Sequence, residues 1–193
     1  RIGSVRTSSA VTNVRRAPDG VYITVGSKIE RFDEVVFACH APQSRSLLED
    51  ATAAESEILG DMRCSHNTVA LHQDASVMPK HRAVWASWNY HATQGSTQAG
   101  LTYYMNRLQN FETTLPVLVT LNEVDSIDPA RLIKTLNYAH PIFDQNMLKA
   151  QRRHAEISGH QRTHYCGAYW FNGFHEDGVV SALRVVREIE ASL

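Results

Sequence analysis

The first forty residues alternate between short runs rich in β-branched and aromatic side chains and turns that contain glycine. This pattern predicts β-strands over 10–14, 21–25 and 30–32. Residues 34–38 form a continuous apolar run, which is typical of a fully buried, parallel strand. Pro42 then begins a helix that extends through Leu48.

The middle of the chain is predicted to be strands that alternate with turns. A second helix is predicted over 51–58, and 91–100 is a polar, glycine-containing loop. Asp128 and Pro129 start a short turn or helix, and 144–153 is a surface helix. The candidate strands after the second helix are 68–72, 83–88, 101–105, 116–121 and, last, 162–165. The expected fold class is therefore α+β, with roughly seven to ten strands and few helices.

The chain closes with GAYWFNGFHEDGVVSALRVVREIEASL, residues 167–193. A last helix is predicted here, because apolar residues recur at helical spacing at Val179, Leu183, Val186 and then Ile189 or Glu190. The other side of this helix carries Arg184, Arg187 and Glu188.

Glu176 and Asp177 precede this last helix, where a carboxylate favours the positive end of the helix dipole and Asp177 can act as the N-cap. A helix N-terminus reached through Gly173 and Gly178 suits an anionic or electron-rich ligand group. A capped helix with a tight entry loop and no ligand explains the same residues.

The composition is that of a globular protein: 193 residues, 43% hydrophobic and 20% charged, enough for one large domain or two small ones. A net charge of -1 gives no argument for a nucleic acid or an anionic membrane as partner. No apolar run approaches the roughly 18 residues of a membrane span, and no signal peptide is evident. Cys39, Cys64 and Cys166 are widely spaced, which favours free thiols and a cytoplasmic location. Because Arg1 runs at once into strand-like residues, we expect a piece of a longer protein.

Ten histidines raise the question of a metal site. His160 and His164 are four residues apart, but on a strand that spacing separates them by about 13 Å. This is too far for one zinc ion, and neither HExxH nor CxxC occurs, so no metal site is expected. GxSxG is absent as well, and Cys39 and Cys166 are expected to be small buried side chains rather than nucleophiles.

Three segments together resemble the flavin-containing amine oxidoreductase family, most closely its bacterial branch of NAD/FAD-binding proteins. The resemblance covers nearly the whole chain, and its third segment is the most specific. The segments are VTNV at 11–14 with DGV at 19–21 and FDEVVFA at 32–38; YYMNRLQ at 103–109 with VTLN at 119–122; and YCGAYW at 165–170 with GFHEDG at 173–178.

The resemblance implies a mixed β-sheet substrate domain, of the amine-oxidase type, together with the C-terminal remnant of a Rossmann-like FAD-binding domain. Residues 1–45 would be the late part of the FAD-binding domain, 46–160 the substrate domain, and 161–193 the return to the FAD-binding domain. The family's GxGxxG is absent from this sequence, so the partner that completes the cofactor site would be the missing N-terminal part of the same protein. The fragment alone is expected to hold FAD weakly and to be inactive.

The resemblance also implies roles for particular residues. Backbone N–H groups near Phe174, His175 and Glu176 would hydrogen-bond the N1–C2=O edge of the isoalloxazine, where negative charge develops when flavin accepts a hydride. The backbone of Val11 would meet the adenine. The cofactor-binding set is Val11, Gly167, Gly173, Phe174, His175, Glu176 and Gly178.

The substrate side is expected on strands of the substrate domain, although core packing also places aromatic residues on strands. The substrate-binding candidates are Trp88, Tyr90, Tyr103, Tyr104 and Asn106. The polar candidates for a catalytic role are His175 and Asn67.

One departure from the family bears on the chemistry. Typical amine oxidases carry a lysine near the flavin N5, and the matching stretch, residues 64–71, contains none. The resemblance implies a fragment of an FAD-dependent oxidoreductase of the amine-oxidase type, which transfers a hydride from a substrate carbon to flavin. Its expected partner is a small-molecule substrate, an amine or an unsaturated lipid. The alternatives are an FAD-dependent desaturase or isomerase of lipids or isoprenoids, and a non-catalytic binding domain.

Overall fold

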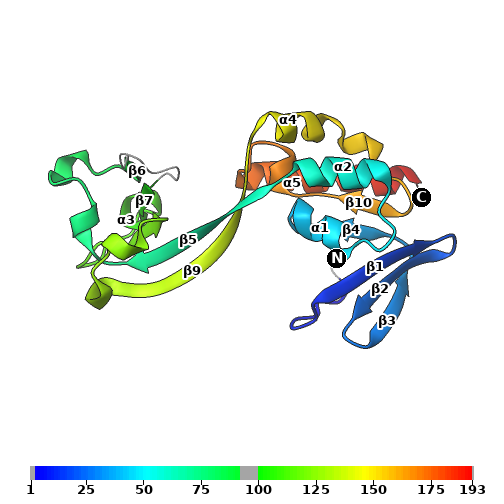
Figure 1. Cartoon of the computed structure of the whole chain (residues 1–193), viewed down its shortest axis with the longest axis horizontal. Helices are drawn as coiled ribbons and strands as arrows, with labels where there is room; N and C mark the ends of the chain where they lie inside the picture. Colours follow the sequence, from blue (N-terminus) through cyan, green and yellow to red (C-terminus); the bar gives the residue numbers. More distant parts are fainter. Residues whose placement is uncertain (1–2, 92–99, 193) are drawn as a thin grey trace. The chain divides into compact units, whose positions relative to one another are not determined.

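A computed structural model describes residues 3–91 and 100–192, and the chain divides into two compact units (Figure 1). The first unit comprises residues 1–64 and 141–193, and the second comprises 65–140. These boundaries differ from the expected 45/46 and 160/161, because the helices that follow the first sheet pack within the first unit. Which unit serves the cofactor and which the substrate stays a prediction.

The first unit contains two sheets. Strands β1 (Val11–Ala17), β2 (Gly20–Val25) and β3 (Lys28–Phe32) form an antiparallel meander. Strand β4 (Val35–Phe37) pairs in parallel with β10 (Thr163–Tyr165), although 125 residues separate them. The predicted parallel strand is therefore confirmed. Its predicted complete burial is wrong, because Val36 points to a face of the sheet that is left partly open, with 42% of its surface exposed.

Helices complete this unit: α1 (Ala41–Leu47), α2 (Ala53–Asp61), α4 (Gln145–Arg152) and α5 (His175–Ser192), with short 3₁₀ turns at His154–Glu156 and Ala168–Trp170. The start of α2 is fixed by Thr52, whose hydroxyl accepts a hydrogen bond from the Glu55 N–H while the Glu55 side chain accepts one from the Thr52 N–H. The core places the rings of Phe37 and Tyr165 in a stack, 5.5 Å between centroids.

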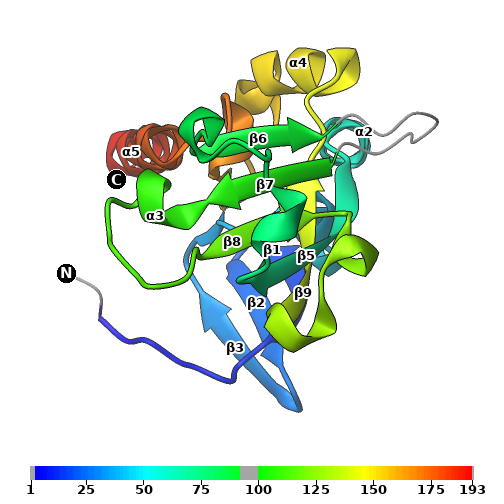
Figure 2. The same cartoon turned by 90° about the vertical axis from the view of Figure 1, so that its left-hand side faces the viewer.

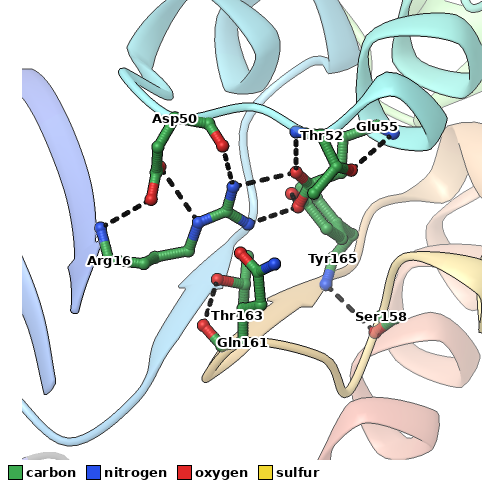
Figure 3. Close-up of polar contacts among 8 residues, drawn as sticks. All are labelled: Arg16, Asp50, Thr52, Glu55, Ser158, Gln161, Thr163 and Tyr165. Atoms are coloured by element: carbon green, nitrogen blue, oxygen red, sulfur yellow. Dashed lines mark hydrogen bonds and ion pairs between the residues drawn. The ribbon is translucent and has the colours of Figure 1, made fainter. Parts of the chain in front are cut away.

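A buried ion pair joins the meander to the rest of the first unit (Figure 3). The Arg16 guanidinium of β1 binds the Glu55 carboxylate of α2, and Tyr165 Oη of β10 donates to the same carboxylate at 2.7 Å. Asp50 accepts from Arg16 Nε at 3.0 Å. Burial alone would raise the pKa of Glu55, but hydrogen bonds from Arg16, Thr52 and Tyr165 outweigh it and hold that pKa below its ordinary value.

The second unit is built on a five-stranded sheet in the order β6-β7-β8-β5-β9 (Figure 2). Its strands are β5 (Cys64–His72), β6 (Trp88–His91), β7 (Gly100–Tyr104), β8 (Leu118–Leu121) and β9 (Leu132–Pro141). The short helix α3 (Met105–Leu108) follows β7, and 3₁₀ turns lie at Ala75–Val77, Arg82–Val84, Val124–Ser126 and Pro129–Arg131. The predicted loop over 91–100 falls largely on 92–99, which lie outside the described residues.

A hydrogen-bonded chain of buried side chains crosses the sheet of the second unit. His72 Nδ1 accepts from the Asp74 N–H, so its Nε2 carries the proton and donates to Thr120 Oγ1 at 2.7 Å. The hydroxyls of Thr120 and Thr102 lie 2.7 Å apart. Burial lowers the pKa of His72, which keeps the imidazole neutral inside this network.

Two predictions for the second unit are wrong. The expected strand over 83–88 begins only at Trp88, after a 3₁₀ turn at Arg82–Val84 and an irregular segment. In that segment the Trp85 ring packs edge-on against Tyr104, and its indole N–H donates to the Pro79 carbonyl at 2.8 Å. The long strand β9 was not expected at all, since LIKTLNYAHP shows no regular alternation of buried and exposed positions. The α+β class itself is confirmed, and the other predicted strands and helices lie close to observed ones.

The last helix begins at His175, as its pattern predicts, with two corrections. Asp177 is not the N-cap: it lies in the first turn, and its carboxylate accepts the Phe174 N–H at 2.9 Å. The Val179, Leu183 and Val186 face points outward, whereas Ser181 and Val185 are buried. No helix in the described part of the chain combines the length and the hydropathy that crossing a bilayer requires.

Candidate cofactor site and substrate face

The carboxyl ends of β4 and β10 lie at the same edge, since the two strands are parallel. The segments that leave these ends are Cys39–His40 and the closing loop, 166–174. They meet there, because Tyr169 Oη donates to the Cys39 carbonyl at 3.2 Å. In open sheets with parallel strands, ligands bind outside the carboxyl ends of the strands. This edge is therefore the candidate cofactor site.

The closing loop is anchored on two sides. The Gly167 N–H donates to Ser181 Oγ of α5 at 3.0 Å. The Gln151 side chain of α4 donates to the carbonyls of Tyr169, at 2.8 Å, and Phe171. Sequence reasoning missed Gln151, because nothing in a surface-helix pattern indicates that one polar residue points inward to hold a distant loop.

The glycines of the loop differ in why they are needed. At Gly167, φ is +151° and a Cβ would lie 2.5 Å from the Tyr169 ring, so the close approach is to Tyr169. Gly173 has φ +90°, which also favours glycine. Gly178 lies inside α5, where a Cβ would come no closer than 3.9 Å to Ala168 Cβ. Of these three glycines, Gly178 alone has neither a positive φ nor a close contact that a Cβ would disturb.

The N-terminus of α5 supplies hydrogen-bond donors. The first-turn N–H groups of His175, Glu176 and Asp177 have no carbonyl partner inside the helix, and the helix dipole makes this end positive. Phe174, His175 and Glu176 are exposed at this end. The arrangement can bind an anionic or electron-rich edge of a ligand through backbone groups.

Val11 lies at the start of β1 and lines a groove of about 640 Å³ that extends along β4 to Cys39. The other lining residues are Val14, Ile23, Val35, Val36, Phe37, Ala38, Gln43, Ser46 and Leu47. Val11 and Cys39 line the same groove, and the Cys39 carbonyl accepts a hydrogen bond from Tyr169 of the closing loop.

The nearby thiol of Cys166 is buried, and burial raises its pKa, so it stays protonated near neutral pH. Cys39 Sγ lies 3.3 Å from Ser44 Oγ at the start of α1. Cys166 is buried as expected, whereas Cys39 is only partly buried, so the expected burial of Cys39 is wrong.

Three histidines of the first unit contact carboxylate or carbonyl oxygens of the same unit. His164 lies between two carboxylates, with Nδ1 3.3 Å from Glu188 of α5 and Nε2 3.4 Å from Glu34. His154 Nε2 donates to the Tyr165 carbonyl at 2.7 Å, and burial lowers its pKa. His160 Nε2 contacts the Ala155 carbonyl. Among the described residues, no three histidine, cysteine or carboxylate side chains gather as metal ligands would.

The aromatic candidates of the second unit divide between two faces of its sheet. Trp88 pairs with Tyr103 across β6 and β7, so their side chains share a face, and Tyr90 lies on it too, stacked with Trp88 at 6.3 Å. The exposed fractions of Trp88 and Tyr90 are 55 and 58%. Tyr104 points to the other face, where its ring packs on Trp85 at 5.3 Å.

The side chain of Asn106 is hydrogen-bonded to the loop that follows it. Its Nδ2 donates to Thr113 Oγ1 at 2.6 Å, and its Oδ1 accepts the Val117 N–H at 2.7 Å. Of the five substrate candidates, Trp88, Tyr90 and Tyr103 thus form one open aromatic face, whereas Tyr104 and Asn106 have structural partners.

Asn67 belongs to a polar cluster on β5. Its Nδ2 lies 2.9 Å from His140 Nδ1 and 3.1 Å from Ser65 Oγ, and its Oδ1 accepts from Asn122 Nδ2 at 2.9 Å. Residues 67, 69 and 71 alternate to one side of β5, and Leu71 pairs with Val119, which pairs with Tyr103. Asn67 therefore projects from the same face as the exposed aromatic rings. Sequence reasoning missed His140, because it lies on the unpredicted strand β9.

Three kinds of comparison with known proteins were made. No protein-family model matches the sequence, and a search of curated proteins gives no match, but solved structures with the same fold were found. The chain shares its fold with about half of each of several solved enzyme structures, so the resemblance read from the sequence is confirmed at the level of the fold.

The matching structures include a fatty acid isomerase from P. acnes that produces CLA, with a TM-score of 0.61 and 14% identity over 93% of this chain. Two engineered variants of putrescine oxidase, a double and a triple mutant, match with TM-scores of 0.57 and 0.61, at 12% identity over 95 and 96% of this chain. The matches cover 47, 48 and 49% of those chains, so this chain spans about half the length of the structures it matches.

Proposed function

We propose that the chain is part of an FAD-dependent oxidoreductase of the amine-oxidase type. Its first unit would contribute one side of the cofactor site and its second unit a surface for the substrate. The observation that carries the proposal is the junction of Cys39 with the closing loop at the carboxyl ends of two parallel strands, beside the N-terminus of α5. The match in fold to oxidases and an isomerase supports it.

The residues at this edge fit a flavin. The N–H groups of His175, Glu176 and Asp177 can donate to the oxygen- and nitrogen-rich edge of the ring, and the backbone of Val11 can meet the adenine. Gly178 has space for a Cβ that no described residue occupies, which suits close approach by a ligand. When bound, FAD supplies a two-electron acceptor for a hydride that leaves a substrate carbon.

The chain's own groups would bind and orient the substrate and stabilise the charge on the cofactor. The positive end of α5 favours the charge that accumulates on the cofactor edge during hydride acceptance. Trp88, Tyr90 and Tyr103 offer flat apolar surface to a substrate. Asn67, held by His140 and Asn122, is a fixed amide that can hydrogen-bond a polar group of the substrate. His175, exposed in the first turn of α5, is the second polar candidate.

The absorption spectrum of the purified full-length protein tests the proposal. A flavin spectrum that bleaches anaerobically with an amine supports amine oxidation. A protein that remains colourless after incubation with FAD would contradict the flavoenzyme proposal and favour a non-catalytic binding domain.

A second candidate function is isomerisation or desaturation of an unsaturated lipid or isoprenoid. It is favoured by the open aromatic face of β6 and β7 and by the absence of lysine from residues 64–71. Isomerisation differs from both desaturation and amine oxidation in electron balance, and the class of substrate that bleaches the flavin separates the last two. An isomerase converts substrate without net reduction of its flavin, whereas amine oxidation or desaturation leaves one reduced flavin for each product formed anaerobically.

A further inference from the structure

A chain of hydrogen-bonded side chains in the second unit ends at His140 of β9. Asn122, which follows β8, donates from Nδ2 to Asn67 Oδ1 at 2.9 Å. Asn67 Nδ2 donates to Ser65 Oγ at 3.1 Å and lies 2.9 Å from His140 Nδ1. Neighbours on both sides of the Asn67 amide thus hold it in one orientation.

The orientation of Asn67 determines which nitrogen of His140 carries the proton. An amide nitrogen is a donor only, so His140 Nδ1 accepts the hydrogen bond from Asn67 Nδ2. A ring nitrogen that accepts carries no hydrogen, and the proton of the neutral imidazole is therefore on Nε2. His140 is half-buried, and no group in the described part of the chain accepts a hydrogen bond from its Nε2. His140 therefore presents one N–H donor, in a fixed direction, that the described fold does not use.

The sheet face that carries Asn67 is open and apolar. The opposite face is covered, since Thr102 and Thr120 on it are buried. Trp88 and Tyr90, by contrast, are more than half exposed. Two rows of paired residues make up the open face, and neither row contains a charged side chain. The rows are Leu71, Val119, Tyr103 and Trp88, and then Val69, Leu121, Leu101 and Tyr90.

We propose that the Nε2–H of His140 binds a carboxylate or carbonyl oxygen of the substrate, while the apolar part of the substrate lies along the two rows. This inference rests on the proposed function, which places the substrate on this face, and it adds the class of substrate. A carboxylate or carbonyl oxygen accepts hydrogen bonds, whereas an alkylammonium group only donates them and cannot bind the Nε2–H. A fixed donor beside an apolar face therefore favours an apolar chain that ends in an acid or a carbonyl over an alkyl amine.

Asn67 is the positioning residue in this arrangement, and the tautomer of His140 tests its part directly. Nitrogen NMR of the full-length protein, labelled in its histidine rings, distinguishes a ring nitrogen that carries hydrogen from one that does not. In mildly alkaline buffer we expect hydrogen on Nε2 of His140 and none on Nδ1. Asn67→Leu removes the donor to Nδ1 and should let the proton populate both nitrogens. Hydrogen on Nδ1 in the unaltered protein would overturn the assignment of the donor.

Two probes that share one apolar chain, oleate and oleylamine, test the substrate class. Isothermal titration calorimetry of the full-length protein should show oleate bound at least about ten-fold more tightly than oleylamine. His140→Phe should weaken oleate binding by about ten-fold, close to the value of one hydrogen bond to a charged group. His140→Gln keeps an N–H donor and should retain most of the preference. His66→Phe is the matched control and should change neither affinity, because His66 is exposed and alternates to the other side of β5 from Asn67.

Two results would overturn the role of His140: equal affinities of the unaltered protein for the two probes, or an unchanged affinity of His140→Phe for oleate. Absorption spectra of the same samples report on the proposed function separately. A protein that takes up no FAD and still prefers oleate through His140 would contradict the flavoenzyme alone. A flavoprotein without the preference would contradict only the role of His140.

Discussion

Tyr165 Oη donates a 2.7 Å hydrogen bond to Glu55, a residue 110 positions earlier in the sequence. The same carboxylate accepts from Arg16 of the meander, so one buried anion joins β1, α2 and β10. Because β10 leads directly into the closing loop, this anion fixes the position of Val11 and the meander relative to the candidate cofactor edge.

Replacing Glu55 with glutamine should destabilise the first unit strongly. Arg16 would keep its charge in a buried site without its closest partner, a situation that costs about 3–5 kcal/mol. Urea denaturation followed by circular dichroism measures this loss. Glu57→Gln is the matched control on the same helix, because Glu57 pairs with Arg153 at the surface and should contribute little. Equal midpoints for both variants would refute the anchoring role.

Local pattern predicted most elements but not the contacts that position the site. The spacing of Val179, Leu183 and Val186 correctly predicts a helix, since any apolar recurrence of this period favours one. It cannot say which face is covered, and the covered face is the one with Ser181 and Val185. The pairing of Arg16 with Glu55 has no sequence signal at all, because it depends on residues 39 positions apart meeting in three dimensions.

In the candidate site too, local sequence patterns predicted some features, whereas the tertiary contacts could not be predicted. The loop with Gly167 and Gly173 could be predicted because positive φ values favour glycine. The separation of Tyr103 from Tyr104 onto opposite faces follows from strand alternation once β7 is placed. Gln151 and His140 could not be found, because each acts through a tertiary contact with a segment that its own sequence neighbourhood does not indicate.

Stability of the second unit should fall as the pH drops below the ordinary histidine pKa of about 6.5. The folded state lowers the pKa of His72, so its neutral form contributes stability that is present above that value and is lost as pH falls through the folded pKa. Denaturant midpoints measured at intervals between pH 7 and 5 follow this loss. His72→Gln keeps a donor toward Thr120 and should reduce the pH dependence; an unchanged slope would count against His72 as its source.

His154 should give the first unit a pH dependence of the same direction, because burial lowers its pKa too. The carboxylate of Glu55 contributes in a separate, more acidic window, since its pKa is lowered and its stabilisation is lost only below the ordinary carboxyl value of about 4.3.

Replacing Gly167 or Gly178 by alanine should change the stability of the protein in opposite directions. Gly167→Ala forces a Cβ against the Tyr169 ring at a backbone angle that disfavours it, which should cost about 1–3 kcal/mol. Gly178→Ala lies inside a helix with room for the methyl group and should stabilise the protein by about 0.5–1 kcal/mol. If FAD approaches α5 at Gly178, the same variant should bind FAD more weakly despite its greater stability. Thermal denaturation and FAD titration separate the two effects, and Gly178→Ala with unchanged FAD affinity would remove Gly178 from the cofactor site.

Replacing Trp88 by alanine should change substrate binding, whereas replacing Tyr104 by alanine should lower stability. Trp88 is more than half exposed, on the open aromatic face, so Trp88→Ala should leave stability nearly unchanged. If this face receives the substrate, the variant should raise KM by about three- to ten-fold, the value of one aromatic contact. Tyr104→Ala removes the ring that packs on Trp85 and should cost about 2 kcal/mol of stability. Steady-state kinetics and urea denaturation of the full-length variants measure both quantities, and a Trp88→Ala protein with lowered stability but unchanged KM would mean that this face packs against protein rather than substrate.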